Sequence, residues 1–176
     1  STIGHRLTGS ENGKKAEEYT FKKFKEYGFE DVAFQEFEVT AWSRGKLNVV
    51  IDGAPMPAVT LAHSPITADV AGEVVDMGNG LEKDYEEKPG AVKDKIALIY
   101  IGILDESGEG LLNLHRSEKA AIAIKHGAKG VIILNKVDDG VLLTGTASVT
   151  GELITIPAVC IGKENGMALK EKLKTK

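Results

Sequence analysis

The sequence predicts a mixed α/β fold built around a parallel strand-helix-strand crossover. Two apolar runs, residues 96–101 and 131–134, have no polar face, which is typical of strands covered on both sides. Between them, residues 117–126 are rich in Ala and Ile, end at Gly127 and predict a helix. This order predicts two parallel strands joined by a right-handed crossover, with helix and sheet in three layers.

The first predicted element is an amphipathic helix over residues 10–27. Ser10 is suited to cap its start, and Gly28 to end it. Spacing at 3.6 residues per turn puts several apolar side chains on one face: Ala16, Phe21, Phe24 and Tyr27. Because an isolated helix of this length is marginal in water, we expect this face to pack on this chain or on a second copy.

Short strands follow. Alternating apolar residues over 32–39 predict a strand with a bulge near Gln35 and Glu36. Residues 47–51 continue in strand fashion to the Asp52-Gly53 turn, and 59–61 form another short strand.

The remaining elements flank the crossover. Residues 70–77 predict a strand interrupted by Gly72 and closed by a glycine-rich turn at 78–80. Residues 155–161 predict a buried strand with Pro157 near its start, and 167–173 a closing helix. The sequence therefore predicts short strands separated by frequent turns.

The amino-acid composition excludes several classes of function. The chain has 176 residues, is 42% hydrophobic and carries a net charge of −4, which fits one globular domain with or without an appendage. The sequence has no cluster of positively charged residues of the kind that nucleic-acid binding requires. Its longest apolar runs are far shorter than the roughly 20 residues that a membrane-spanning helix needs. A single cysteine, Cys160, excludes an internal disulfide and a multi-cysteine zinc site.

Common catalytic motifs are absent from the sequence. It contains no phosphate-binding loop, no Gly-x-Ser-x-Gly elbow, and no histidine with a second ligand at metal-binding spacing. We therefore predict no catalytic, cofactor-binding or metal-binding residue and, for the chain alone, neither zinc binding nor peptide hydrolysis.

Four features of the sequence are candidate sites, and each is better explained by a structural role. Cys160 lies in an apolar strand, where a thiol packs inertly, and His126 lies at a helix end, where a cation is favoured. His63 and Ser64 are adjacent on an extended segment, so their side chains should diverge. The acidic loop 105–110 does not match the spacing of a calcium loop and is predicted to be solvated.

Several motifs occur in the order of a known family. Downstream these are Lys119, Ala123, Gly127, Ala128, Gly130-Val131-Ile132-Ile133, Ile156-Pro157-Ala158-Val159, Ile161 and Gly166. Upstream they are Ala68-Asp69-Val70, Gly72, Val74, Val75 and the stretch 92–98. Together they resemble the protease-associated (PA) domain, which implies a three-layer β/β/α fold with flanking helices.

The N-terminal part resembles a different region of one host family. Arg6, Gly9-Ser10, the helix up to Tyr27, Gly28-Phe29 and Gln35-Glu36-Phe37 resemble the start of M28-type zinc aminopeptidases and carboxypeptidases. Trp42, Arg44-Gly45 and Ser64-Pro65 are most similar to the carboxypeptidase Q branch. The resemblance implies an N-terminal arm at 1–41, a PA domain at 42–162 and a helix at 163–176 that leads toward a peptidase domain.

The implied function is that of a non-catalytic part of a secreted or periplasmic zinc exopeptidase. In that family the zinc ligands begin with a His-x-Asp pair downstream of the PA domain, and this sequence reaches Lys176 before one, so zinc is expected only in the peptidase domain. Expected partners are that peptidase domain, a peptide or protein substrate, and a second copy of the chain; nucleic acid and membrane are not expected. The alternative is an independent protein- or peptide-binding module without a peptidase.

Overall fold

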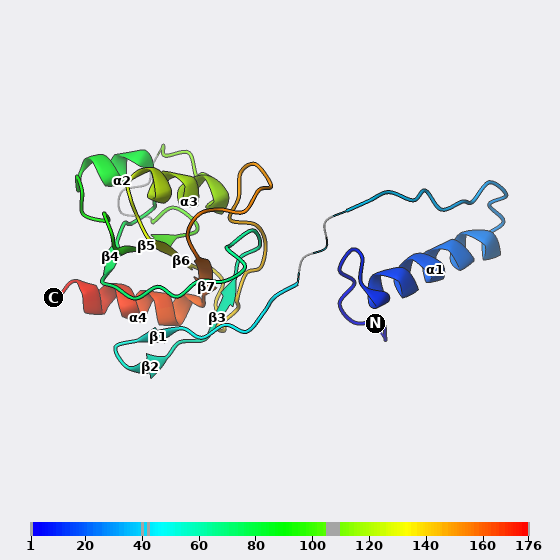
Figure 1. Ribbon diagram of the computed structural model, residues 1–176, viewed down its shortest axis with the longest axis horizontal. Coiled ribbons are helices and arrows are strands. Elements are labelled where there is room, and N and C mark those ends of the chain that lie inside the picture. Colours follow the sequence, from blue (N-terminus) through cyan, green and yellow to red (C-terminus); the bar gives the residue numbers. More distant parts are fainter. Residues whose placement is uncertain (1, 40, 42, 105–109, 176) are drawn as a thin grey trace. The chain divides into compact units, whose positions relative to one another are not determined.

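The computed structural model describes residues 2–39, 41, 43–104 and 110–175, which form two compact units (Figure 1). The first unit comprises Ser1–Ser43 and the second Arg44–Lys176. Each unit is described by itself below.

The first unit is built around helix α1 (Glu11–Glu26), as predicted. Ser10 is its N-cap, since the hydroxyl of Ser10 accepts a hydrogen bond from the amide of Gly13 at 3.0 Å. Gly28 follows the C-cap with φ of +86°, a left-handed conformation that glycine adopts without strain.

The predicted strand over 32–39 is wrong. The structure assigns no strand to the described residues of the first unit. The ring of Phe34 stacks instead on that of Phe21 in α1, with centroids 4.7 Å apart, and Phe29 contacts Phe24 edge-on at 5.5 Å. Phe34 of this segment therefore contacts the helix, whereas Phe37 and Val39 are exposed, and no strand is assigned to the unit's described residues that could pair with the segment.

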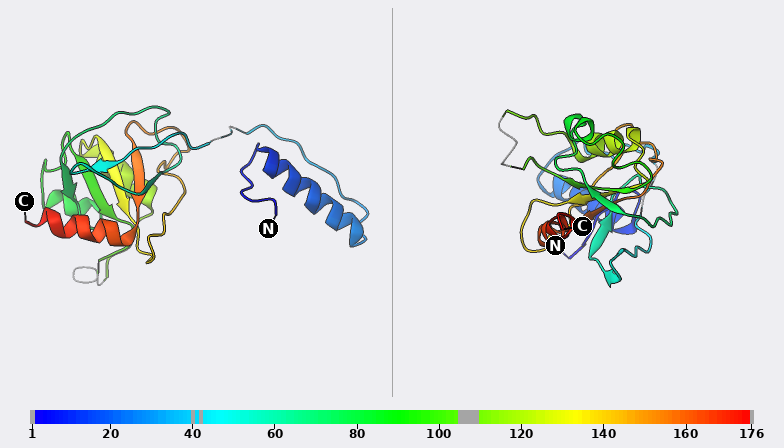
Figure 2. Two further views of the ribbon diagram at one scale, coloured as in Figure 1. Left: turned by 90° about the horizontal axis from the view of Figure 1, so that it is seen from below. Right: turned by 90° about the vertical axis from the view of Figure 1, so that its left-hand side faces the viewer.

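Seven strands and three helices are assigned to the described residues of the second unit (Figures 1 and 2). The strands are β1 (Val50–Ile51), β2 (Ala54–Pro55), β3 (Ala58–Thr60), β4 (Val74–Asp76), β5 (Ile96–Tyr100), β6 (Gly130–Leu134) and β7 (Ala158–Ile161). The helices are α2 (Glu82–Glu86), α3 (Arg116–Lys125) and α4 (Lys163–Leu173). Helix α2 was not predicted, because its five residues are too few to show a helical period.

Strands β1 and β2 form a hairpin, and the other five form one sheet in the order β3-β7-β6-β5-β4. Strands β4 to β7 are parallel, and β3 is antiparallel to β7. Strands β5 and β6 pair along their whole length, from Ile96↔Gly130 to Tyr100↔Leu134, and α3 connects them. The predicted α/β fold and parallel crossover are therefore confirmed.

Side chains alternate between two apolar faces of this sheet. Ala97, Ile99 and Val131 pack with α3 and with Tyr85 of α2, whereas Leu98 and Ile132 pack with α4. The figures show α2 and α3 on one side of the sheet and α4 on the other (Figure 2). The hairpin contributes Ile51 to the α4 side. Both faces of the parallel strands are thus covered, which explains why their sequences have no polar side.

Helix α4 begins four residues before the predicted start. Gly162 is its N-cap and Gly166 lies inside it, where glycine ordinarily weakens a helix. A Cβ atom at Gly166 would lie 2.2 Å from Cγ of Leu134, so this glycine allows α4 to approach the sheet closely. Packing has overridden the local helix preference of the sequence.

The hydroxyl of Tyr85 is buried without a hydrogen-bond partner among the described residues. Since an unpaired buried hydroxyl is costly, we expect Tyr85→Phe to leave the free energy of unfolding unchanged or to raise it by about 1 kcal/mol. Urea denaturation of both proteins measures this change. Tyr85→Ala is the control and should cost about 3 to 5 kcal/mol, because it removes the ring. A loss above about 1 kcal/mol for the Phe variant would show that the hydroxyl is hydrogen-bonded.

The apolar face of α1 yields a second prediction. Phe24→Asp should lower the melting temperature or change the solution mass, because it places a charge against Phe29 where an edge-on aromatic pair now stands. Differential scanning calorimetry and light scattering are the measurements. Lys22→Asp, at an exposed position of α1, is the control and should change neither quantity. A Phe24→Asp variant with the parent's melting temperature and mass would mean that this face is unpacked.

Candidate functional site

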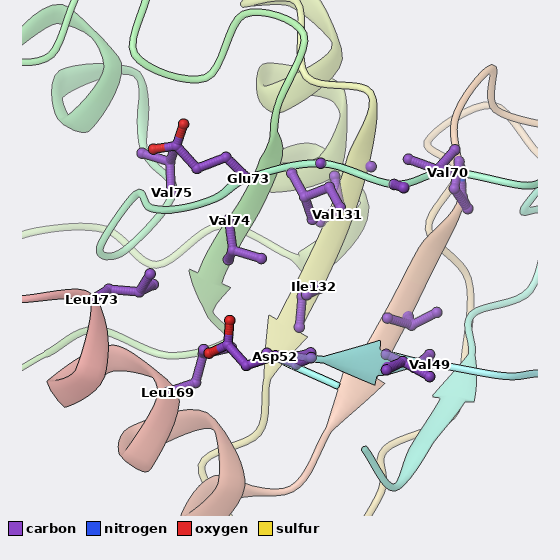
Figure 3. Close-up of a pocket in the computed structure, with 18 of the residues that line it drawn as sticks. Val49, Asp52, Val70, Glu73, Val74, Val75, Val131, Ile132, Leu169 and Leu173 are labelled. Carbon is purple, nitrogen blue, oxygen red and sulfur yellow. The ribbon is translucent and has the colours of Figure 1, made fainter. Parts of the chain in front are cut away.

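A groove of about 920 Å³ lies on the second unit, on the face of the sheet that carries α4 (Figure 3). Its floor consists of four apolar side chains from neighbouring strands, Val74, Ile96, Ile132 and Val159. Figure 3 shows Val74 and Ile132 pointing into the space beside α4. The groove therefore borders the second apolar core, in which Ile132 and Val159 are buried and Val74 and Ile96 are partly buried.

Three segments form its walls. One is residues 47–52, which lead into the hairpin, and another is residues 68–73, which run toward β4. The third is the end of α4, with Leu169, Leu173 and Lys174. Asp52 and Gly53 turn the hairpin with φ of +50° and +80°, the conformation that a two-residue Asp-Gly turn requires.

Gly72, in the wall formed by residues 68–73, lies very close to the side chain of Lys129. A Cβ atom at Gly72 would lie 2.5 Å from Cε and 2.7 Å from Nζ of Lys129, so glycine leaves room for the lysine to lie against this segment. Gly72, which the sequence predicts to interrupt a strand over 70–77, lies in the groove wall, and the strand itself begins only at Val74.

Ion pairs fix the walls and occupy the carboxylates that line the groove. Lys172 of α4 binds Asp52 at 2.6 Å, and Lys170 binds Asp76. Glu73 at the rim is paired with Lys95 at 2.8 Å. The two lysines of α4 hold that helix against the hairpin turn and β4.

Two lysines near the groove have no carboxylate partner among the described residues. Lys88 donates its ammonium to the carbonyl of Asp76 at 2.9 Å, and Lys129 lies against Gly72. All three lining carboxylates are paired, so the charge left available at the groove is positive. The arrangement can bind an apolar segment bearing a carboxylate.

The described residues contain no cluster of three or more His, Cys, Asp or Glu side chains that could hold a metal ion. The predicted absence of catalytic, cofactor and metal residues stays a prediction, because the described part of the chain tests it only for such clusters.

Cys160, His126, His63 and Ser64, the described candidate residues of the sequence, do not line the groove. Cys160 is fully buried, and burial raises the pKa of its thiol, as expected of a packed side chain. His126 caps α3; its Nε2 lies 2.8 Å from Glu82, and its ring stacks on Tyr85 at 4.6 Å.

His63 and Ser64 do not form a catalytic pair. Nδ1 of His63 is 2.8 Å from Oγ1 of Thr146, whereas the hydroxyl of Ser64 donates to the carbonyl of Ala158 and accepts from its amide. The two side chains have separate partners, but the segment is not extended as predicted, because His63 has a φ of +67°. Of the acidic loop 105–110, residues 105–109 lie outside the described residues, so the prediction for this loop stays a prediction.

Lys119 is the most deeply buried charge of the second unit's described residues. Its ammonium donates to the carbonyls of Tyr100 and Gly102, both at 2.8 Å, and so holds the chain leaving β5. Burial lowers the pKa of Lys119 from 10.5 to about 8. The sequence marks Lys119 only as part of a family motif, because nothing local reveals that a helix lysine turns inward.

The lowered pKa of Lys119 predicts a pH-dependent stability. Between pH 8 and 10.5 the unfolded chain binds this proton more tightly than the folded chain, so the free energy of unfolding rises with pH in that window. Lys119→Met should reduce the slope by up to about 1.4 kcal/mol per pH unit. Urea denaturation across the window measures it. Lys136→Met, at an exposed lysine, is the control, and equal slopes for all three proteins would contradict the inward ammonium.

Comparison with known proteins identifies relatives of both units. The model of the PA domain family matches residues 67–169. Aminopeptidase YwaD of Bacillus subtilis (strain 168) is 28% identical over 96% of this chain, and the chain spans about a third (34%) of that relative's length.

Solved structures agree with this match. An aminopeptidase from Aneurinibacillus sp. strain AM-1 superposes with a TM-score of 0.67 and 31% identity, over 98% of this chain and 38% of its own. A peptidase M28 precursor from Shewanella amazonensis SB2B gives a TM-score of 0.74 and 27% identity, over 98% and 41%. Within the described residues, no helix is long and apolar enough to cross a membrane.

Proposed function

This chain belongs to the PA domain family, and we propose that it serves as the non-catalytic accessory part of a secreted M28-type zinc exopeptidase. In this role the second unit contributes to substrate access and peptide selection beside a peptidase domain. The chain is related to M28 zinc aminopeptidases by sequence and fold, and the proposal extends that relation to their activity.

One observation carries the proposal. The similarity to aminopeptidases covers 96 to 98% of the chain, whereas the PA model covers only residues 67–169. The match therefore includes the first unit with α1, which a free-standing PA module would not need. An N-terminal arm followed by a PA domain favours an M28 host over an independent binding module.

The surface of the first unit supports a partner domain. The side chains of Tyr27 and Phe37 are 73% and 75% exposed, although both are large and apolar. Exposed aromatics gathered on one small unit are typical of a surface that another protein surface covers. We assign that role to the peptidase domain, with a second copy of the chain as the competing partner.

Zinc belongs to that peptidase domain in this proposal. The relatives include a zinc aminopeptidase, but the described residues offer no cluster of metal-binding side chains, so they do not fit a zinc site. No catalytic step is assigned to them. The carboxypeptidase Q branch, suggested by residues such as Arg44-Gly45, and location outside the cytoplasm are finer parts of the same proposal.

The coding sequence beyond Lys176 tests the proposal directly. We expect it to encode a His-x-Asp pair and further His and acidic zinc ligands, and the full protein to release N-terminal residues from peptides in a chelator-sensitive way. Hydrolysis of an aminoacyl p-nitroanilide and of peptides, with and without chelator, measures this. A reading frame that ends near Lys176 would instead favour the independent binding module.

A further inference from the structure

We propose that Arg116, the first residue of α3, is the anchor of a carboxylate-binding site, which takes an acidic side chain or the C-terminal carboxylate of a peptide. The inference deepens the proposed function and rests on it for the choice of a peptide over other anions. Three features carry it: a guanidinium without a partner, a loop shaped to receive that group, and the fork formed by its accessible N–H donors.

The charge of Arg116 has no partner among the described residues. The chain has three arginines, and Arg6 and Arg44 each donate a hydrogen bond to a backbone carbonyl. Arg116 makes no hydrogen bond or ion pair in the part of the chain that the structure describes, and its Nε is buried without an acceptor. The nearest acid in the sequence, Glu118, accepts instead from the amide of His115 at 2.8 Å. Because a guanidinium stays protonated in proteins, a half-buried cation is left uncompensated.

The loop between β6 and β7 is shaped to receive this guanidinium. A Cβ atom at Gly145 would lie 1.8 Å from Nη2 and 2.7 Å from Cζ of Arg116, so only glycine leaves room for the group. Gly145 also has φ of +139°, a conformation that other residues rarely adopt. Its carbonyl accepts from the amide of Ala62 at 2.7 Å, and the amide of Ala147 donates to the carbonyl of Ala62 at 2.9 Å. These backbone bonds fix the loop around the guanidinium, so the site is preorganised.

Cys160 of β7 lies on the inner side of the guanidinium. Burial raises the pKa of the Cys160 thiol, and the positive charge of Arg116 opposes that rise, which places the two groups near each other. Since Cys160 is fully buried, this side is closed to a ligand. Among the guanidinium nitrogens only Nε is buried without a partner, so Nη1 and Nη2 keep access to solvent. A ligand therefore approaches from outside, onto the two Nη groups.

The two Nη groups select a carboxylate. They direct two parallel N–H donors outward, which match the two oxygens of a carboxylate, and a charged acceptor makes such bonds shorter and stronger. Because Arg116 is half-buried, its charge is screened less than that of a fully exposed arginine. An amide of the same shape offers a single oxygen and no charge. The site therefore distinguishes Glu from Gln, and a free C-terminus from an amidated one.

The test follows the Nε–H resonance of Arg116 in proton–nitrogen correlation NMR spectra of the full chain, assigned by its loss in Arg116→Lys. The probe is the peptide Ala-Leu-Glu-Leu-Ala, acetylated and amidated at its ends, and the matched control has Gln in place of Glu. We expect a saturable shift with the Glu peptide and about tenfold weaker binding of the Gln peptide. A Gln peptide with a free C-terminus separates the two carboxylate sources. Equal shifts with the amidated Glu and Gln peptides would overturn the proposal.

Variants separate the fork from charge alone, with binding of the Glu peptide read from the backbone amide of Ser117. Arg116→Gln should weaken binding about tenfold, and Arg116→Lys nearly as much, because lysine keeps the charge and loses the fork. Gly145→Ala keeps Arg116 but places a Cβ atom where Nη2 lies, and should also weaken binding. Lys136→Gln removes a charge at an exposed position and should leave affinity unchanged. The comparison of Glu and Gln peptides uses the unaltered chain, so it decides the question even where a variant fails to fold.

Failure here is distinguishable from failure of the proposed function. Absence of any shift of the Arg116 resonance would overturn the carboxylate site whatever the sequence beyond Lys176 encodes. Tighter binding of inorganic phosphate or acetate than of the Glu peptide would overturn the peptide as ligand class. Saturable binding of the Glu peptide, with no peptidase encoded downstream, would keep the site and reject the zinc exopeptidase host.

Discussion

The architecture of the second unit depends on the need to cover both faces of the central parallel strands. Residues on β5 and β6 are apolar in succession, so each strand presents apolar side chains on either side of the sheet. One cover comes from the crossover helix α3, which the parallel connection itself supplies. The other has to come from a later part of the chain, and α4 provides it.

The second cover is less complete than the first. Gly166 brings α4 into close contact with Leu134, near the end of β6, and Lys170 and Lys172 anchor the helix to Asp76 and Asp52. These contacts set the position of α4 and leave the beginnings of the strands, at Ile96 and Gly130, to line the groove. The groove is therefore a consequence of where the second covering helix is fixed.

Predictions from the sequence were correct for features that are encoded within a single helix, strand or turn. The continuous apolar runs, the Ala-rich crossover helix, the cap at Ser10 and the Asp52-Gly53 turn all depend on residues close in the chain, and the structure contains each of them. The prediction of a strand over 32–39 was wrong because it depended on a partner that the local pattern does not identify. Alternation shows that Phe34 has an apolar partner, but not whether that partner is a sheet or the ring of Phe21.

The groove could not be predicted, because its residues come from the hairpin, from four strands of the sheet (β4 to β7) and from α4. In the sequence Gly72 is a strand interruption and both Gly72 and Gly166 are parts of a family motif. The physical reason for each glycine lies in atoms far along the chain, Nζ of Lys129 and Cγ of Leu134. The local charge of the groove could not be predicted either. The sequence shows a mildly acidic chain, whereas two lysines near the groove have no carboxylate partner among the described residues. Local attraction for a carboxylate within a chain of net charge −4 depends on which acids are already paired, and only the folded arrangement determines that pairing.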